Sequence, residues 1–308
     1  MAEAVATLAN MVLINDRNLS EIEIPNFFSN SPFMRTNAAT TASYDTKHRW
    51  IRHADPAVAA RAVNDGREVQ KSVDTMVEID LKILDGSFRV DRELVREYHR
   101  GGQAGWLNRE LARHLNAMMF HSEKQVFRGT ANDSLYFSGF PNVTELATIG
   151  GGGVISAGGS TASSQTSAYV VRSGSMDVEI VTGYSGSIAV GEPTIQETTG
   201  ATTGTFPAIY VAVGGWYGLK VGSTVTSVKR IANIESSFTD DHIYAAIKEF
   251  DSGRQPTHIY CSRKALELLR SSRTATNISG DPAGRPTTIE GIPIIPTDGI
   301  SVTEAVVT

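Results

Sequence analysis

Two segments in which residue types alternate with a period of two most constrain the fold of this chain. Over 44–50, Tyr, Thr, His and Trp alternate with Asp, Lys and Arg, and over 73–83 mostly apolar residues alternate with polar ones. This period is typical of extended strands, which here flank a tip around residues 55–66. An isolated ribbon of two strands is marginal in water and leaves strand edges unpaired. The pattern therefore predicts that a neighbouring subunit covers the ribbon.

The closing stretch, 289–306, is a second strong constraint because it cannot form a helix. Isoleucines at 292, 294 and 295 are interrupted by Pro293 and Pro296, and an acidic turn follows at Asp298. Proline lacks the backbone N–H that a helix interior or central strand needs. The stretch is predicted to be a short edge strand, and it contains no catalytic motif.

Length and composition set broad limits on fold and function. With 308 residues, 41% of them hydrophobic and 20% charged, the chain is long enough for one large domain or two ordinary ones. The formal charge of -5 argues against wrapping of nucleic acid by global electrostatics, although a local basic face stays open. The single cysteine, Cys261, follows Ile259 and Tyr260, which predicts a buried reduced thiol and favours assembly in a cytoplasm.

Neither a membrane span nor a secretory signal is predicted. No run of about 18 apolar residues occurs, and the first residues lack the basic region and cleavage site of a signal peptide. We therefore expect no membrane as a partner.

Residues 1–43 are predicted to be an N-terminal arm, and residues 44–90 an extended hairpin loop. The arm contains Phe27, Phe28 and Phe33 among prolines, with too little periodic sequence to enclose these rings locally. The rings need a covering surface, which either the same chain or a neighbouring subunit can supply.

Residues 91–238 are predicted to contain a long helix that can serve as a spine, followed by a β-rich segment. Helical sequence pauses at the glycines of 101–105 and resumes at Trp106, and one face then holds Leu107, Leu111, Leu115, Met118 and Val126. This predicts a helix of about 22 residues that ends at Gly129. Beyond it, glycine and serine at 150–164 predict a flexible loop, and valine-rich runs predict strands near 168–171, 178–181, 209–213 and 225–231.

Residues 239–308 are predicted to form a small α+β domain. Thr239 is a helix cap before Asp240 and Asp241, whose carboxylates favour the positive end of a helix dipole. A strand at 258–261, a helix at 263–272 and the closing edge strand complete this part.

Candidate chemical motifs are all better explained by structure, so we predict no catalytic, cofactor-binding or metal-binding residues and no enzymatic activity. His114 and His121 could share a helix face, yet no HExxH motif or cysteine pair accompanies them. The run Asp240, Asp241 and His242 is consistent with helix capping, since consecutive side chains point in different directions. Gly150–Gly153 lacks the lysine of a phosphate loop, and Gly183–Ser187 lacks the second glycine of a nucleophile elbow, which favours a hairpin turn.

Basic residues on and just after the predicted helix at 263–272 leave alternatives open. Arg263, Lys264, Arg270 and Arg273 could contact nucleic acid or another subunit, or they could form a solvated helix face.

Taken in order, these elements resemble the major capsid proteins of tailed bacteriophages (Caudoviricetes), which have the Hong Kong 97-type shell fold. The resemblance rests on the arm, the hairpin, the spine helix and three ordered segments: TSAYVVRSG from Thr166, WYGLKVGSTVTSVKRIANI from Trp216 and IEGIPIIPTDGISVTEAVV from Ile289. It implies an α+β, Hong Kong 97-like fold and a structural protein that self-assembles into hexamers and pentamers of an icosahedral shell around double-stranded DNA.

The resemblance also implies partners and a location. Because some members carry a long N-terminal scaffolding segment and this chain begins almost directly with the arm, a separate scaffolding protein is expected, together with a portal and, as an optional partner, a decoration protein. Packaged DNA lies on the inner face, and the virion capsid is assembled in the host cytoplasm. Phe27, Phe28, Val77 and Ile79 are expected to pack on neighbouring subunits. Lys71 lies near the loop position through which some members cross-link, but no partner constellation accompanies it, so cross-linking is not carried over.

Two alternatives remain at this point. An encapsulin-like cellular compartment would use the same fold to hold a cargo protein, and its gene neighbours would distinguish it. A β-rich hydrolase or sugar-binding module is suggested only by the Ser, Thr and Gly content and by aromatic residues expected to be exposed, such as Trp216 and Tyr217.

Overall fold

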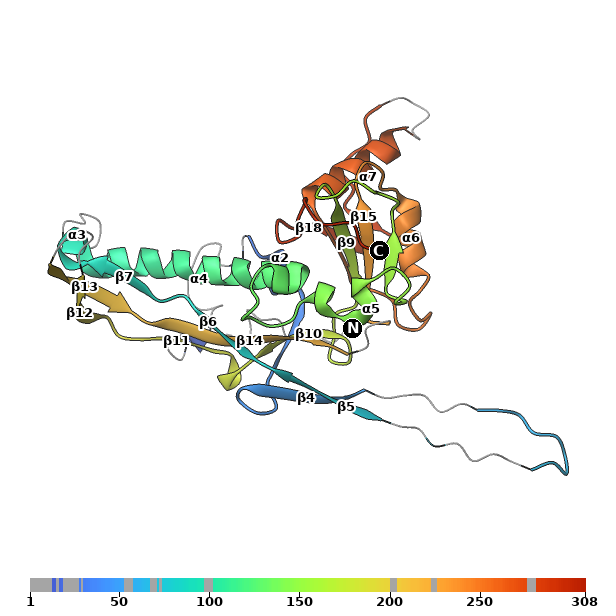
Figure 1. Ribbon diagram of the computed structural model, residues 1–308, viewed down its shortest axis with the longest axis horizontal. Helices are drawn as coiled ribbons and strands as arrows, with labels where there is room; N and C mark the ends of the chain where they lie inside the picture. The colour runs from blue at the N-terminus through green and yellow to red at the C-terminus, as the bar shows by residue number, and fades with distance from the viewer. Residues whose placement is uncertain are drawn as a thin grey trace.

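The computed structural model describes residues 13–14, 17–18, 28, 30–52, 58–66, 71, 74–96, 102–199, 204–222, 226–275 and 281–308. The chain is elongated, with a long helix lying along a β-sheet, an α/β part at one end and a ribbon that projects beyond that end (Figure 1). No helix in the described ranges has the length and apolar character needed to cross a membrane.

The long helix is α4 (Gly102–Arg128), which is the spine of the molecule. Leu107, Leu115, Met118 and Val126 are buried, which confirms the predicted apolar face. The helix has 27 residues and runs through Gly105, where the sequence predicted a pause. An internal glycine costs only about 1 kcal/mol relative to alanine, so burial of this face outweighs it. The predicted end is confirmed, since Gly129 follows with a left-handed φ of 57°.

The spine sheet packs under α4 and contains strands from distant parts of the chain. Its order is β2-β1-β11-β14-β10-β3, and β6 pairs with the other edge of β14. The strands are β1 (Leu13–Ile14), β2 (Arg17–Asn18), β3 (Ala38–Thr41), β6 (Lys82–Asp85), β10 (Val178–Thr182), β11 (Ser187–Val190) and β14 (Val213–Val221). Because β1 pairs with β11 and β3 with β10, the described arm residues add strands to their own chain's sheet.

Gly183–Ser187 forms a tight turn, with positive φ at Tyr184 and Ser185. The turn does not close the predicted hairpin, because β10 and β11 both pair with β14 rather than with each other.

At the far end of the spine, β12 (Thr194–Thr199), β13 (Thr205–Val211) and β7 (Phe88–Asp91) form another sheet, and α3 (Arg92–Arg96) lies beside it. The helix α2 (Pro32–Thr36) and the short helix α5 (Thr144–Ala147) lie near the other end of α4. Short 3-10 turns occupy Gly129–Ala131, Phe140–Asn142 and Tyr184–Gly186.

The axial sheet has the order β17-β18-β16-β9-β15-β8 and is flanked by α6 (Asp240–Ile247) and α7 (Arg263–Ala275). Its strands are β8 (Val154–Ser156), β9 (Thr166–Val171), β15 (Val228–Ile234), β16 (His258–Cys261), β17 (Thr288–Ile289) and β18 (Ile292–Pro296). The sheet thus contains strands from both sides of residue 238, where the sequence predicted a boundary. Part of the glycine-rich stretch predicted as a loop is strand β8, which pairs with β15. The predicted edge strand, β18, lies one place inside the edge, covered by the two residues of β17.

The described residues form two hydrophobic cores that meet at an aromatic joint. One core lies between α4 and the spine sheet, and the other lies within the axial part. At the joint the rings of Phe33, Phe127, Phe140, Tyr169 and Tyr260 pack with centroid separations of 5.0–6.0 Å. Phe33 of the arm is therefore covered by its own chain.

Phe28 is partly buried against the spine core of its own chain, whereas Phe27 lies outside the described residues. Their predicted packing on neighbouring subunits stays a prediction. Cys261 is a buried free thiol, as predicted, and burial raises its pKa to about 12.

Candidate assembly surfaces

The ribbon formed by β4 (Lys47–Arg52) and β5 (Thr75–Asp80) presents two different faces. On one face the cross-strand pairs Trp50–Val77 and His48–Ile79 are buried or half-buried. This is the face that the sequence alternation identified. Val77 and Ile79, predicted to pack on neighbours, are thus partly covered by their own chain, and that contact stays a prediction.

The other face of the ribbon is exposed along its whole length. Ile51 pairs with Met76, and these side chains are 51% and 66% exposed. Next to them, Glu78 accepts a hydrogen bond from Lys47 at 2.8 Å and another from Arg49. Sequence reasoning missed this apolar pair, because both residues occupy the alternating positions that it assigned to the polar side. In the part of the chain that the structure describes, neither β4 nor β5 pairs with a third strand. The backbone edges and the Ile51–Met76 pair are available to a partner.

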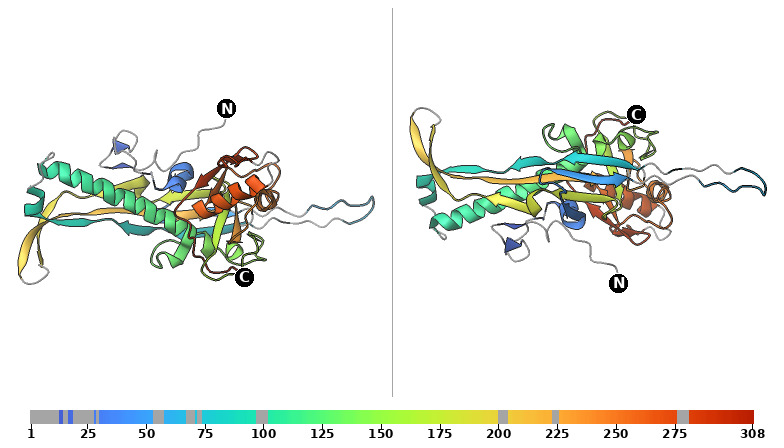
Figure 2. Two further views of the ribbon diagram at one scale, coloured as in Figure 1. Left: turned by 90° about the horizontal axis from the view of Figure 1, so that it is seen from above. Right: turned by 90° about the horizontal axis from the view of Figure 1, so that it is seen from below.

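The tip of the ribbon extends past the rest of the molecule (Figure 2). Every residue of 58–66 is exposed, and Val58 and Val63 are 93% and 90% exposed. Lys71, noted in the sequence, is exposed as well. Burial of these two apolar side chains against another surface would stabilise that contact.

His48 and Trp50 lie at the base of the ribbon with unsatisfied polar atoms. The side-chain nitrogens His48 Nε2 and Trp50 Nε1 are buried, and no hydrogen-bond partner was found for either among the described residues. Burial lowers the pKa of His48, and the nearby Lys220 ammonium adds to this effect. Both effects disfavour the charged form of the imidazole.

A groove of about 810 Å³ runs between α4 and the outer edge of the spine sheet, at β6. Ile83 and Leu135, which line it, are 58% and 85% exposed. His114 and His121 also line the groove, so the predicted shared helix face is confirmed. His121 lies 3.4 Å from Asp133, and the ring of His114 packs 4.9 Å from the ring of Phe88. Each histidine therefore has a contact within the chain.

Glu123 of α4 connects the arm, the spine helix and the axial part. Its carboxyl accepts the Phe33 backbone N–H at 2.9 Å and the hydroxyl of Thr297. Burial raises the pKa of Glu123 to about 8, while the hydrogen bonds from Thr297, Phe33 and Met34 oppose that rise. Sequence reasoning missed this residue. The available signal was a carboxylate placed on the apolar face of the predicted helix, four residues after Met119.

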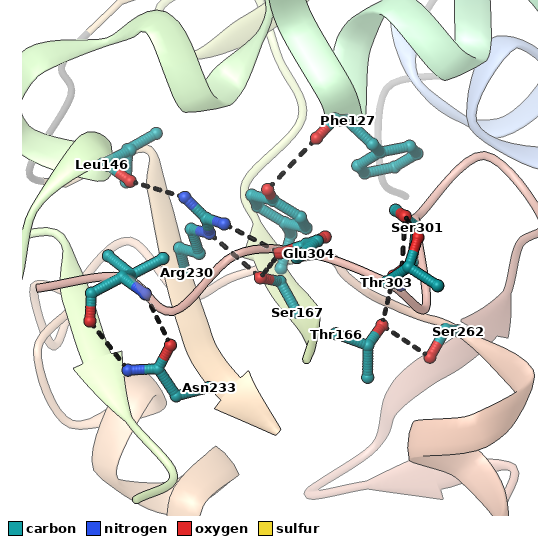
Figure 3. Close-up of polar contacts among 12 residues, drawn as sticks. Phe127, Leu146, Thr166, Ser167, Arg230, Asn233, Ser262, Ser301, Thr303 and Glu304 are labelled. Carbon is teal, nitrogen blue, oxygen red and sulfur yellow. Dashed lines mark hydrogen bonds and ion pairs between the residues drawn. The ribbon is translucent and has the colours of Figure 1, made fainter. Parts of the chain in front are cut away.

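Hydrogen bonds and an ion pair hold the C-terminal segment, 300–308, against strands β9 and β15 of the axial sheet (Figure 3). The Arg230 guanidinium donates to Glu304 at 2.8 Å, to Ser167 at 3.0 Å and to the Leu146 carbonyl at 3.2 Å. Asn233 sits in the irregular part of β15 with a positive φ of 58° and exchanges two hydrogen bonds with the backbone of Val307.

An ionic cluster joins the two sheets. Asp177, in the connection from β9 to β10, accepts hydrogen bonds from Arg172 at 2.6 Å, from Arg254 at 2.9 Å and from the Ser227 hydroxyl at 2.7 Å. The connections from β9 to β10 and from β14 to β15 both pass between the two sheets. Because Ser227 lies in the second connection, just before β15, the cluster links the two connections by hydrogen bonds. The relative placement of the two cores is thereby fixed by the monomer itself.

The remaining predicted candidates are occupied by contacts within the chain. The His242 ring nitrogen accepts the Thr239 N–H, which confirms capping of α6, and Asp240 pairs with Arg273 at 3.0 Å. Arg263 pairs with Asp298, Lys264 donates to the Ser164 carbonyl and Arg270 donates to the Ala283 carbonyl. The expectation of exposed aromatic side chains is wrong for Tyr217, which is 2% exposed because it packs in the spine core.

Comparison with solved structures places this arrangement in a known class. The chain is similar to a protein chain in the structure of bacteriophage Epsilon15, with a TM-score of 0.63, 17% sequence identity and coverage of 100% of this chain and 99% of the other. It is also similar to the capsid protein of bacteriophage JBD30, with a TM-score of 0.51, 11% identity and coverage of 91% and 94%. The fold is therefore the α+β, Hong Kong 97-type fold of phage capsid shells.

The family follows from the sequence itself. The family model for the major capsid protein GP7 matches residues 22–308, and the chain belongs to that family. It is a major capsid protein of the tailed-phage type. No curated protein matches the chain.

Proposed function

We propose that this capsid protein assembles into hexamers and pentamers that close an icosahedral shell around the double-stranded DNA of a tailed bacteriophage. The observation that carries the proposal is the ribbon, whose strands pair only with each other in the described residues and whose Ile51–Met76 pair is exposed. A surface of this kind is stable when a neighbouring subunit covers it.

The proposal includes partners and a division of the chain. A separate scaffolding protein and a portal act during assembly in the host cytoplasm, and a decoration protein is an optional addition to the virion capsid. Residues 1–43 act as the arm, 44–90 as the extended loop, 91–238 as the peripheral domain and 239–308 as the axial domain. Strands β8, β9 and β15, which lie before residue 238, complete the sheet of the axial part. The role is structural, in keeping with the family. The family description also favours a phage shell over a cellular compartment.

The test is a charge placed on the exposed face of the ribbon. In Met76→Glu, a carboxylate replaces an apolar side chain that we expect to be buried against a neighbour, where an unpaired charge is strongly unfavourable. Thr75→Glu is the matched control, because it adds the same charge one residue away on the opposite face of the ribbon. Negative-stain microscopy of the variants, produced with the scaffolding partner, measures closed shells.

We expect Met76→Glu to fold with the circular dichroism spectrum of the wild type and to form few or no shells, whereas Thr75→Glu forms them. Shells of Met76→Glu in wild-type yield would contradict a role for this face. If the wild-type protein itself forms no closed shell, sheet or tube with its scaffold, the proposed function fails.

A further inference from the structure

Arginine side chains from separate parts of the chain line one pocket beside the start of α7. Arg35 lies in the last turn of α2, Arg263 is the first residue of α7 and Arg285 lies in the segment before β17. The pocket has a volume of about 570 Å³, and Leu266 and Ile295 contribute apolar lining. We call it the arginine pocket.

The positive charge of the arginine pocket exceeds its negative charge. Among the described residues that line it, Asp298 is the acidic side chain, and its carboxylate is already paired with Arg263 at 2.7 Å. No ion pair of Arg35 or Arg285 is found within the described residues. Guanidinium groups that gather around one concave site repel each other unless an anion lies between them. The pocket is therefore suited to an anion from outside the described chain.

The lining favours phosphate over other anions. A guanidinium group presents parallel N–H donors whose geometry matches two oxygens of a phosphate or carboxylate. The positive end of the α7 dipole, at Arg263, adds an attraction that anions at helix N-termini experience. A tetrahedral phosphate offers oxygens in several directions, so guanidinium groups that approach from separate elements can bind it together. We propose that the arginine pocket binds a phosphate group.

Two sources of phosphate fit this chemistry: the backbone of the packaged DNA and free inorganic phosphate. The Arg263 side chain is 78% exposed, and Arg35 and Arg285 are also exposed, so a DNA strand can reach them without any opening of the fold. The chain as a whole carries a charge of -5, which makes a local basic pocket the place where a duplex would make contact. The DNA source rests on the proposed function, whereas the phosphate chemistry does not.

The test is isothermal titration of the unassembled full-length protein with sodium phosphate, with sodium succinate and with a short duplex of random sequence, all at constant ionic strength. Arg285→Gln removes one guanidinium from the pocket, and Arg35→Gln is a second variant. Lys248→Gln is the control, because Lys248 is exposed on the axial part outside the pocket lining and its loss changes the net charge equally. Thermal melts establish that each variant is folded.

We expect saturable phosphate binding that weakens about tenfold or more in Arg285→Gln and Arg35→Gln and is unchanged in Lys248→Gln. If DNA is the source, duplex binding is also weakened. When the duplex titration is repeated at several salt concentrations, the slope of log affinity against log salt becomes shallower by about 1 in Arg285→Gln. Phosphate binding without duplex binding supports the pocket and identifies free phosphate as its ligand.

Several results would overturn the inference: no saturable phosphate binding, equal loss in Arg285→Gln and Lys248→Gln, or succinate binding as tight as phosphate binding. The last result would identify the occupant as an acidic side chain of a neighbouring subunit. Shell formation by Arg285→Gln, followed by microscopy, keeps this outcome separate from the proposed function. Shells that form normally while the pocket binds no phosphate refute the inference alone.

Discussion

The carboxyl group of Glu123 joins the arm to both cores and is also a titratable group buried among them. Burial raises its pKa to about 8 from an ordinary value of 4.5, and the Asp298 carboxylate adds to the rise. Between these pH values the folded chain holds a proton that the unfolded chain releases. The contribution of Glu123 to the free energy of unfolding is therefore fully present below about pH 4.5 and is lost as the pH rises towards 8.

Glu123→Gln is expected to remove this pH dependence, because the amide stays neutral throughout. For one proton, the free energy of unfolding changes by about 1.4 kcal/mol per pH unit. Urea denaturation of the wild type and the variant between pH 5 and 8 measures it, and the variant's curve should fall less steeply as the pH rises. Burial also lowers the pKa of His48 and His258, but both histidines are present in each protein, so their contributions cancel in the difference.

Glu267→Gln, on the exposed side of α7, is the control and should keep the wild-type slope. Parallel pH curves for the wild type and Glu123→Gln would show that Glu123 is already ionised in the fold.

At the same scale, sequence patterns predicted which face of the ribbon is covered, but they did not identify the individual residues on which the assembly surface and the Glu123 contacts depend. The alternation over 44–50 and 73–83 correctly put His48, Trp50, Val77 and Ile79 on one face of the ribbon. It could not show that the spine sheet covers this face, and so Ile51 and Met76 were missed. Glu123 was missed because its partners, Phe33 and Thr297, lie far away in the sequence.

Among the elements, the C-terminal segment holds the axial sheet to the end of the spine part. Removing Glu304 leaves the Arg230 guanidinium buried with neutral partners only, since Arg230 is 5% exposed and otherwise donates to Ser167 and the Leu146 carbonyl. We expect Glu304→Ala to lower the free energy of unfolding by about 2–3 kcal/mol.

Chemical denaturation with a tryptophan fluorescence readout measures this loss. Glu78→Ala removes a carboxylate that pairs with Lys47 and Arg49 on the exposed ribbon, where solvent screens the charges, and should leave stability near that of the wild type. Equal losses in the two variants would show that burial of the Arg230–Glu304 pair is unimportant.

Elements with local signals were predictable, and their assignment to sheets was not. The cap at Thr239 and the apolar periods predicted α6, β16 and α7 close to their observed bounds. By contrast, β9 and β15 are buried on both sides, so they lack the alternation that would show which sheet they join. Their pairing with β16 and β8 depends on contacts distant in sequence.

At the scale of the whole molecule, the described residues bury both hydrophobic cores within one chain, whereas they leave one face of the ribbon exposed. The aromatic joint and the Asp177 cluster fix the two cores relative to each other within one chain. The spine sheet covers one face of the ribbon, whereas the other face and the tip are exposed, and the tip projects away from both cores (Figures 1 and 2). A subunit with a rigid body and an uncovered projecting ribbon is suited to bind to copies of itself.

The most direct test of this account is electron cryo-microscopy of the particles that the protein forms with its scaffold. We predict closed icosahedral shells in which each ribbon crosses a neighbouring subunit and the Ile51–Met76 pair is buried in that contact. Shells in which the ribbon folds back on its own subunit, with Ile51 and Met76 still exposed to solvent, would contradict the account.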